Sequence, residues 1–248
     1  MRARIIIGTS GWHYKHWCGL LYPKKCPPSQ WFDLYAQSFD TVEVNNTFYR
    51  LPTEDALRRW HDAAPAGFCF AVKASRFITH IKRLRDPENA IALFFSRVEL
   101  LGHKLGPILF QLPPNWHVDA ERLADFLRAL PLNHRYVFEF RDESWNTPPI
   151  LDLLRRHKIA FCIHDWRGSQ SPVELTADFT YIRFHGATGK YQGNYDDHLL
   201  RSWAERIGNW TSHLSRIYVY FNNDQHGYAV SNAQTLQQLL NRDLSRAA

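Results

Sequence analysis

Short runs of alternating apolar and polar residues recur along the chain, and several of them end in a charged group. In the run FCFAVKA, Phe68, Phe70 and Val72 share one parity and Lys73 has the other. Successive side chains of a β-strand point to opposite faces. The same alternation places four more ionisable groups opposite large apolar neighbours: Glu43, Glu139, Arg183 and His185. Because desolvating an isolated ion costs several kcal/mol or more, we expect these groups to share a polar cavity.

Strand-like and helix-like patterns alternate over the whole chain. The predicted strands are Arg4–Gly8, Thr41–Asn45, Phe68–Ala74, Pro107–Gln111, Arg135–Phe140, Ile159–Ile163, Thr180–His185 and Ile217–Asn222. The predicted helices are Ser29–Ser38, Glu54–Ala63, Glu88–Leu101, Ala120–Leu130, Pro149–His157, Asp197–Leu214 and Asn232–Leu240. The sixth strand is followed by no clearly marked helix. Strands separated mostly by helices imply parallel crossover units. Eight of them predict an α/β fold, a (β/α)8 TIM-type barrel, which commonly needs about 250 residues.

A doubly wound open sheet is the alternative architecture. Such sheets usually carry a GxGxxG turn after the first strand, and the sequence GTSGW lacks that spacing. Strands of an open sheet covered on both faces are also apolar throughout, whereas these alternate. The chain has no internal repeat and no linker, so we expect a single barrel domain over residues 1–248.

Composition narrows the function only slightly. The formal charge of +6 leans toward anionic partners, but Lys and Arg are scattered and form no nucleic-acid-binding tail. The four cysteines show no CxxC spacing, which is typical of a reduced intracellular protein. The chain enters its first strand almost at once, and no apolar stretch is long enough to span a bilayer. We therefore expect a cytoplasmic protein without a membrane partner.

In a barrel, the strand ends and the loops after them form one rim, where active sites lie. The expected catalytic groups there are Glu43, Lys73, Glu139 and His185. Further inward or loop groups that we expect to bind substrate are Asn45, Gln111, Arg141, Arg183, Lys190, Asn222, Trp12 and Trp145. Asp165 also belongs to this rim. The alternative interpretation is a satisfied network of ion pairs and amides that fills the barrel.

Each catalytic role that these residues could have is weighed against another interpretation of the same residues. Glu43 and Glu139 could divide acid and base work, as in glycosidases, but nearby Lys and Arg would lower both carboxyl pKa values. Lys73 could form a Schiff base, yet a countercharge role is simpler. His164, His185 and the carboxylates could hold a divalent metal. A metal is not favoured, because the sequence lacks HExxH and the neighbouring cations would repel the ion. The cofactor therefore stays unknown.

The loop HGATGKYQGNYDD follows the seventh strand and contains Gly186, Gly189, Lys190 and Gly193. Glycines let backbone N–H groups approach an anion, and barrel phosphate sites often use this loop. A glycine-rich lid that binds no phosphate is the competing interpretation. Trp12, Trp116, Trp145 and Trp166 follow other strands, where they could stack bases or simply pack over the barrel.

Ordered segments along nearly the whole chain carry a family resemblance. GTSGWHYKHWCGLLYP, FDTVEVNNTFYRLP, FAVKASRFITH, ILFQLPPNW, EFRDESW, YIRFHG and YVYFNNDQHGYAVSNA resemble the YecE-like family, known as domain of unknown function 72. The resemblance implies a TIM-type barrel and leaves the reaction open. Carried over, the motifs fall on Thr9, Ser10, Gly11, Trp12, Glu43, Asn45, Tyr49, Arg50, Lys73, Arg76, Gln111, Glu139, Arg141, Trp145, Arg183, His185, Gly186, Asn222 and Asn223.

Two functions follow as hypotheses. The first is an enzyme, a hydrolase or a lyase or isomerase, acting on an anionic phosphorylated or nucleotide-like small molecule at the barrel mouth. Arg183 and Lys190 would hold the anion with help from Arg76 or Arg141, a glutamate would be the base, and His185 the acid or its partner. The alternative is a nucleic-acid-binding protein, with or without nuclease activity, that uses basic loops and tryptophans. A non-catalytic sensor or scaffold is also open.

Overall fold

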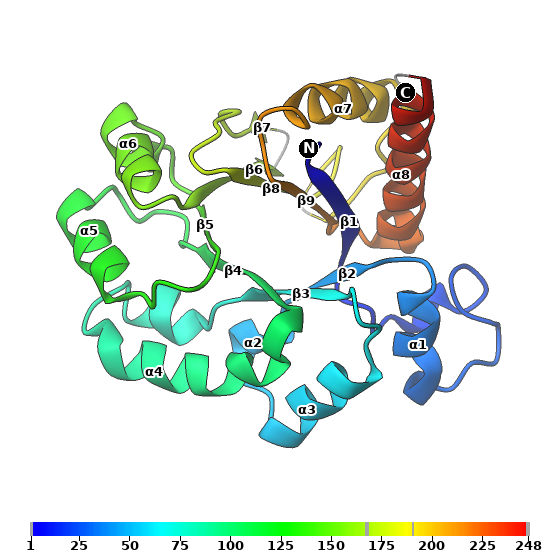
Figure 1. The fold of residues 1–248 in the computed structure, drawn as a ribbon, viewed down its shortest axis with the longest axis horizontal. Coiled ribbons are helices and arrows are strands. Elements are labelled where there is room, and N and C mark those ends of the chain that lie inside the picture. Colours follow the sequence, from blue (N-terminus) through cyan, green and yellow to red (C-terminus); the bar gives the residue numbers. More distant parts are fainter. Residues whose placement is uncertain (1, 167–168, 190, 247–248) are drawn as a thin grey trace. The chain divides into compact units, whose positions relative to one another are not determined.

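The structure is a computed structural model of the 248-residue chain and describes residues 2–166, 169–189 and 191–246. Its strands follow the order β5-β4-β3-β2-β1-β9-β8-β6-β7, and β5 pairs in addition with β6 (Figure 1). The short strand β7 is antiparallel to β6. The other eight described strands form a parallel β-barrel with surrounding helices. This TIM-like α/β fold confirms the predicted fold class.

The strand and helix bounds agree closely with the hydrophobic pattern. The strands are β1 (Arg4–Ser10), β2 (Thr41–Val44), β3 (Cys69–Lys73), β4 (Leu105–Gln111), β5 (Tyr136–Glu139), β6 (Ala160–Trp166), β7 (Ser169–Gln170), β8 (Phe179–Phe184) and β9 (Arg216–Phe221). The α-helices are α1 (Trp31–Ala36), α2 (Asn46–Tyr49), α3 (Glu54–Ala63), α4 (Pro87–Val98), α5 (Ala120–Ala129), α6 (Pro148–Arg156), α7 (Asp197–Trp210) and α8 (Tyr228–Arg246).

The chain divides into two compact units. The first unit contains Met1–Val42, Ile163–Val173 and Asp178–Ala248, and the second contains Glu43–Cys162 and Glu174–Ala177. The expectation of a single domain over residues 1–248 stays a prediction.

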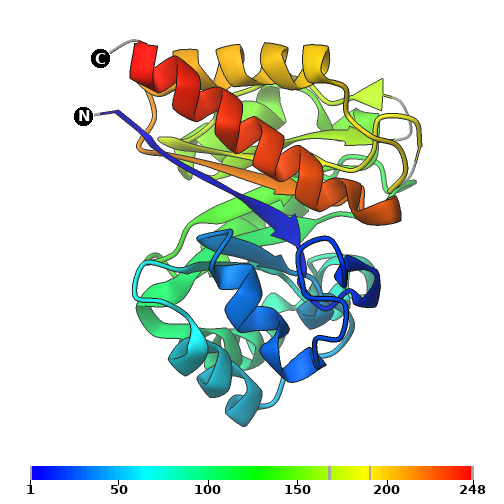
Figure 2. The ribbon, with the colours of Figure 1, turned by 90° about the vertical axis from the view of Figure 1, so that its right-hand side faces the viewer.

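In the first unit, β1 and β8 both pair with β9 in parallel. The β1 register runs from Arg4 opposite Arg216 to Thr9 opposite Phe221. Helices α7 and α8 lie side by side, and α8 also packs on β1 (Figure 2). Helix α7 buries Leu200, Trp203, Ala204 and Ile207, the spacing that places residues on one helical face.

In the second unit, β3, β4 and β5 pair in parallel, with Gln111 opposite Glu139 at the last position. Helix α3 begins at the cap residue Thr53, whose hydroxyl accepts the Ala56 N–H. At the other end of α3, the buried Lys104 ammonium donates to the carbonyls of His61 and Ala64. A cation there satisfies carbonyl groups that have no partner within the helix.

The structure differs from the predicted elements where the signals are shortest. Helix α2, directly after β2, and a π-helix at Phe77–Ile81, directly after β3, were not predicted. The expected helix 197–214 ends at Trp210, and α8 begins at Tyr228 rather than at Asn232. After β6, the described residues form the β7 pairing instead of a helix. Segments of four or five residues are too short for a periodicity to be read.

Candidate functional site

The ionisable groups that the alternation singled out are buried. The exposed fraction is 0% for Glu43 and Glu139, 1% for Arg183 and His185, and 8% for Lys73. Glu43, Lys73 and Glu139 belong to the second unit, and Arg183 and His185 to the first. The structure therefore presents two clusters, one in each unit.

In the second unit, Glu139 at the end of β5 forms an ion pair with the buried guanidinium of Arg141. The thiol of Cys162 donates to the other carboxylate oxygen of Glu139 at 3.7 Å. Glu139 is the last residue of β5, and Arg141 follows it by two positions. In extended chain, this spacing places two side chains on the same side. The structure thus places a carboxylate and its counterion together in a buried position.

Lys73 ends the neighbouring strand β3, and its surroundings fix its ammonium group. Its Nζ donates to Gln111 Oε1 at 2.6 Å and lies 4.0 Å from the centre of the Phe48 ring. The Thr47 hydroxyl donates to the Lys73 carbonyl at 2.7 Å, which holds α2 against the end of β3. On β2, Glu43 accepts a hydrogen bond from the Asn45 amide at 3.1 Å. The structure thus brings Lys73 and Gln111 together from the ends of the neighbouring strands β3 and β4, whereas Glu43 and Asn45 are two residues apart along the chain.

His80 in the π-helix after β3 is surrounded by positive charge. Partial burial, followed by the charges of Lys73, Arg76 and Arg83, lowers the pKa of His80 from 6.5 to about 4. The imidazole is therefore neutral at pH 7. Its ring meets the Phe48 ring edge-on at 4.9 Å, and its Nδ1 lies 2.9 Å from the Thr79 hydroxyl. Arg76 and Arg83 are exposed. Sequence reasoning missed His80 and Arg83.

The backbone that carries His80 and Arg83 adopts conformations that cost free energy. A π-helix is rare and often marks a functional site. Directly after it, Arg83, Leu84 and Asp86 have φ values of 47°, 65° and 43°, in the left-handed region that disfavours residues other than glycine. The guanidinium of Arg83 also lies 5.9 Å from the Trp116 ring. The segment after β3, which carries Arg76 and Arg83, therefore adopts its conformation at a cost in free energy.

In the first unit, His185 is held by neighbours from β6 and β9. Its backbone N–H donates to Asp165 Oδ1, and its Nδ1 lies 3.2 Å from the Asn222 amide. The Tyr195 hydroxyl donates to Asp165 Oδ2 and accepts the Gly186 N–H at 2.7 Å. Burial, and then the charge of Asp165, raise the pKa of Tyr195 far above its usual value, so its hydroxyl stays protonated. Sequence reasoning missed Tyr195.

A small cavity lies beside this cluster. It holds about 150 Å³ and is lined in part by His164, Asp165, Arg183 and Tyr195, together with apolar residues such as Leu199 and Trp203. A cavity of this size admits a few waters or a small ion, and its polar lining suits either.

The glycines of the loop after β8 are explained by the loop itself. At Gly186, where φ is 136°, a Cβ would overlap the carbonyl oxygens of Gly189 and Gln192. At Gly193, where φ is 89°, it would overlap Thr188. The loop backbone occupies the space that glycine leaves open, which favours a structural role for these two residues. Lys190 lies outside the described residues, and phosphate binding by this loop stays a prediction.

The two tryptophans expected to bind substrate are buried. Trp12 packs edge-on against Phe32, and Trp145 stacks on Phe140 at 5.1 Å while its Nε1–H donates to the Trp116 carbonyl. These contacts favour a packing role, and substrate binding by either ring stays a prediction.

Asp142 begins the turn that carries Trp145, and hydrogen bonding from Ser144 lowers the Asp142 pKa.

A second titratable contact lies in the first unit between the loops after β1 and β9. Asp224 accepts a hydrogen bond from Trp17 Nε1 at 2.8 Å and pairs with His16 Nε2 at 2.8 Å. Burial raises the pKa of Asp224 from 3.8 to about 6, against the opposing effects of Trp17 and His16. Sequence reasoning missed this contact, because its members are 207 residues apart.

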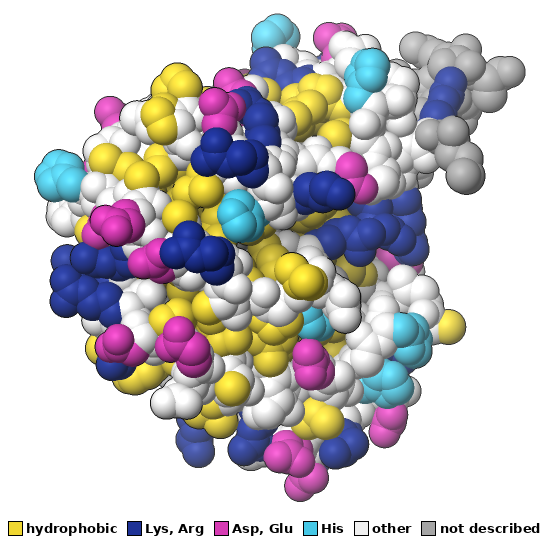
Figure 3. All heavy atoms as spheres, turned by 60° about the vertical axis from the view of Figure 1, so that its left-hand side comes forward, with side chains coloured by type: hydrophobic (Ala, Val, Ile, Leu, Met, Phe, Trp, Pro, Cys, Tyr) yellow, Lys and Arg dark blue, Asp and Glu magenta, His cyan; other side chains and the backbone are white. Residues whose placement is uncertain are grey.

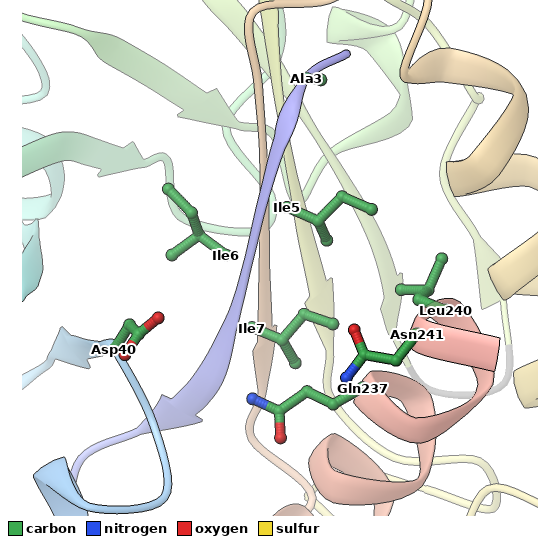
Figure 4. A pocket seen from close by; sticks show the side chains of 8 residues that line it. All are labelled: Ala3, Ile5, Ile6, Ile7, Asp40, Gln237, Leu240 and Asn241. Atoms are coloured by element: carbon green, nitrogen blue, oxygen red, sulfur yellow. The ribbon is translucent and has the colours of Figure 1, made fainter. Parts of the chain in front are cut away.

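Another pocket of the first unit lies away from these charges. It holds about 390 Å³ between the start of β1 and the end of α8, and its lining includes Ile5, Ile7, Asp40 and Gln237 (Figure 4). Since the catalytic ends of barrel strands are the carboxyl ends, this position favours a role in stability.

The surface carries its charges in a mixed pattern. On the face drawn in Figure 3, Lys and Arg form several separate groups interspersed with Asp, Glu and apolar side chains.

Among the described residues, no three His, Cys, Asp or Glu side chains converge as a metal site would need. Within the same part of the chain, every helix is too short or too polar to cross a membrane.

Comparison with known proteins identifies the family. The sequence model described as "Protein of unknown function DUF72" matches residues 6–247. The chain belongs to the DUF72 family. This confirms the resemblance inferred from the motifs.

Curated and solved relatives in the family agree with this assignment. The chain is 27% identical to the UPF0759 protein YunF of Bacillus subtilis (strain 168), covering 98% of this chain and 97% of YunF. It is 26% identical to the UPF0759 protein YecE of Escherichia coli O157:H7, covering 83% of this chain and 82% of YecE. A crystal structure of a DUF72 family protein from Thermotoga maritima MSB8 has a TM-score of 0.86 at 28% identity, covering 96% and 99% of the two chains. None of these names states a reaction.

Proposed function

We propose that this DUF72 protein is an enzyme that acts on an anionic, phosphorylated small molecule at the carboxyl ends of the strands of the second unit. The observation that carries the proposal is the buried Lys73 ammonium at the end of β3, fixed by Gln111 and Phe48, in the same unit as the π-helix that carries His80. Burial first, and then the charges of Lys73, Arg76 and Arg83, lower the pKa of His80. Mutually repelling cations around a neutral imidazole favour an anion, because the anion relieves their repulsion. A strongly perturbed pKa at strand ends is itself a pointer to a functional site.

The proposed roles follow from charge and burial. Exposed Arg76 and Arg83 bind the phosphate, and Lys73, held by Gln111, stabilises the negative charge that develops during reaction. Glu139 or Glu43 acts as the general base. In a hydrolysis, the base takes a proton from water as the water oxygen bonds to phosphorus. The ester P–O bond breaks, and the glutamic acid so formed gives its proton to the leaving oxygen, which returns the base to its carboxylate form. A lyase or isomerase reaction would use the same base to remove a carbon-bound proton.

The cluster of the first unit is a separate candidate. Arg183, His185 and Asn222 were expected to bind substrate or to supply the acid, and these roles stay proposals. The contact between His185 and Asn222 supports an imidazole of fixed orientation. Replacement of His185 by Gln tests its role once a turnover assay exists.

The anion site is tested by titrating His80 directly. NMR signals of the imidazole are followed from pH 7.5 to pH 3.5, first alone and then with saturating pyrophosphate or ribose 5-phosphate. We expect the His80 pKa to rise from about 4 toward its ordinary value of 6.5 when the anion is bound. In the variants Arg76→Ala and Arg83→Ala, the unliganded pKa rises and anion affinity falls. His157, an exposed residue at the end of α6, is the control and does not respond.

An unchanged His80 titration at millimolar anion concentrations would reject the anion site. The enzymatic part is tested separately with a panel of phosphate monoesters and diesters. Glu139→Gln or Glu43→Gln is expected to lower turnover by about 100- to 10,000-fold, the usual contribution of a general base. Turnover unaffected by both substitutions would reject the assigned base.

Nucleic-acid binding, with or without nuclease activity, is the alternative function. The exposed side chains of Tyr49 and Phe77 lie in the chain next to Arg50 and Arg76, and this combination of rings and cations favours it. Binding of a strand through phosphate contacts would weaken by about 0.7–0.9 log units per released contact for each tenfold rise in salt. A small-molecule site responds to salt more weakly. Absence of oligonucleotide binding at low salt would exclude the alternative.

A further inference from the structure

Tyr49 is an exposed aromatic residue in an ordered setting. It ends α2, directly after the strand that carries Glu43, and 73% of its surface is exposed. A single exposed aromatic side chain is ordinary on a protein surface. What distinguishes Tyr49 is the set of groups to which its ring is joined.

A chain of ring contacts leads from Tyr49 to the cations of the proposed anion site. The Tyr49 ring meets the Phe48 ring edge-on at 5.0 Å. The Phe48 ring in turn carries the Lys73 ammonium over its face at 4.0 Å and meets His80 at 4.9 Å. The exposed Tyr49 ring is therefore separated from the Lys73 ammonium and from His80 by a single ring, that of Phe48.

The backbone that carries Tyr49 is fixed by the fold. The Thr47 hydroxyl donates to the carbonyls of Val44 and Lys73, so α2 is fastened to the ends of β2 and β3. The adjoining Phe48 is buried. A tyrosine side chain on an anchored backbone has few rotatable bonds, so it binds a planar partner with little loss of side-chain entropy.

We propose that the anionic ligand is a nucleotide, with its base stacked on Tyr49 and its phosphate held by Lys73, Arg76 and Arg83. The assignment rests on the proposed anion site and adds the identity of the organic part. A nucleotide carries a π-face and a phosphate joined by one sugar, which matches an aromatic platform one ring away from a cation cluster. A sugar phosphate offers Tyr49 only C–H groups, and an aliphatic carboxylic acid offers it no ring. Free nucleotides and the terminal nucleotide of a strand share this chemistry.

The test compares four compounds by isothermal titration calorimetry: pyrophosphate, ribose 5-phosphate, adenosine 5′-monophosphate and a short single-stranded oligonucleotide. Stacking of one base is expected to make the nucleotide bind about 5- to 100-fold more tightly than ribose 5-phosphate. Tyr49→Ala removes this preference and leaves ribose 5-phosphate affinity unchanged, whereas Tyr49→Phe keeps it. Leu132→Ala is the matched control, because Leu132 is 97% exposed in the loop that enters β5.

The outcomes separate this assignment from the proposed function. If ribose 5-phosphate binds and the nucleotide binds no more tightly, or if Tyr49→Ala keeps the preference, the nucleotide assignment is wrong and the anion site stands. If none of the compounds binds, both are rejected. A nucleotide preference that Tyr49→Ala abolishes supports the assignment. The oligonucleotide arm then identifies the source: tighter binding than the monophosphate indicates a strand, and equal or weaker binding a free nucleotide.

Discussion

Glu139 and Arg141 show what a single buried charge requires of its neighbours. The carboxylate of Glu139 is completely buried, and its ion pair with Arg141 is buried as well. A buried pair adds little net stability relative to an apolar replacement of both members, because desolvation offsets the attraction. Removing one member is different, since the remaining charge stays buried without its counterion. The same argument explains why Glu43 and Lys73 have polar neighbours, Asn45 and Gln111 respectively.

The first residue-scale prediction follows from this asymmetry. Arg141→Met is expected to lower the free energy of unfolding by about 3–5 kcal/mol, measured by urea denaturation at pH 7. Arg128→Met is the control, because Arg128 pairs with Asp125 on the surface of α5, and its effect should stay within about 0.5 kcal/mol. Equal effects of the two substitutions would contradict the buried pair.

At the scale of elements, the loop after β8 and helix α7 place opposite demands on glycine. Gly186 has a φ of 136° and leaves no room for a Cβ, whereas Gly208 lies within α7 with nothing within 4 Å of such an atom. Only glycine fits the backbone at position 186. At position 208, glycine destabilises the helix relative to alanine, because glycine loses more backbone entropy on folding. The π-helix after β3 is a third case, in which an unfavourable local conformation positions cations.

The element-scale prediction compares the two glycines. Gly186→Ala is expected to destabilise the protein by more than about 2 kcal/mol, through strain and backbone overlap. Gly208→Ala is expected to stabilise it by about 0.5–1 kcal/mol, as in other helix interiors. Thermal unfolding of both variants beside the parent chain measures the two signs. A neutral Gly186→Ala would show that the loop adopts another conformation in solution.

At the scale of the whole molecule, the two compact units are not separate stretches of chain. Strand β2 contributes Thr41 and Val42 to the first unit and its last two residues to the second. Strand β6 likewise contributes Ala160–Cys162 to the second unit and the remainder to the first. Cutting either strand would remove ladder hydrogen bonds from both units.

We therefore expect the units to unfold together. Far-ultraviolet and near-ultraviolet circular dichroism should give coincident urea transitions with a single midpoint, as for a two-state protein. The tryptophans of each unit provide a local probe, since Trp17 lies in the first and Trp145 in the second. Separate transitions for helix content and aromatic packing would show that each unit folds independently.

Much of the fold was readable from the sequence because its signals are local. The alternation around Lys73 and Glu139 predicts both their strands and their burial, and the predicted helix over residues 54–63 has the bounds of α3. The site was predicted only in part. His80, Arg83 and Tyr195 were missed, because they lie outside the predicted strands and helices, where no periodic signal marks a side chain. Trp145 was assigned to binding because sequence cannot tell a buried loop ring from an exposed one.

What the sequence determined by itself is which residues form strands, which of their faces is apolar and which family the chain resembles. These follow from side-chain alternation and from ordered motifs, both of which are local along the chain. Tertiary structure alone decided that the Phe48 ring, which follows β2, contacts Lys73 at the end of β3 and His80 beyond it, and so joins them to Tyr49. The physical reason is that electrostatic and ring contacts depend on distance in space, and residues from different strands approach one another only once the barrel strands have paired.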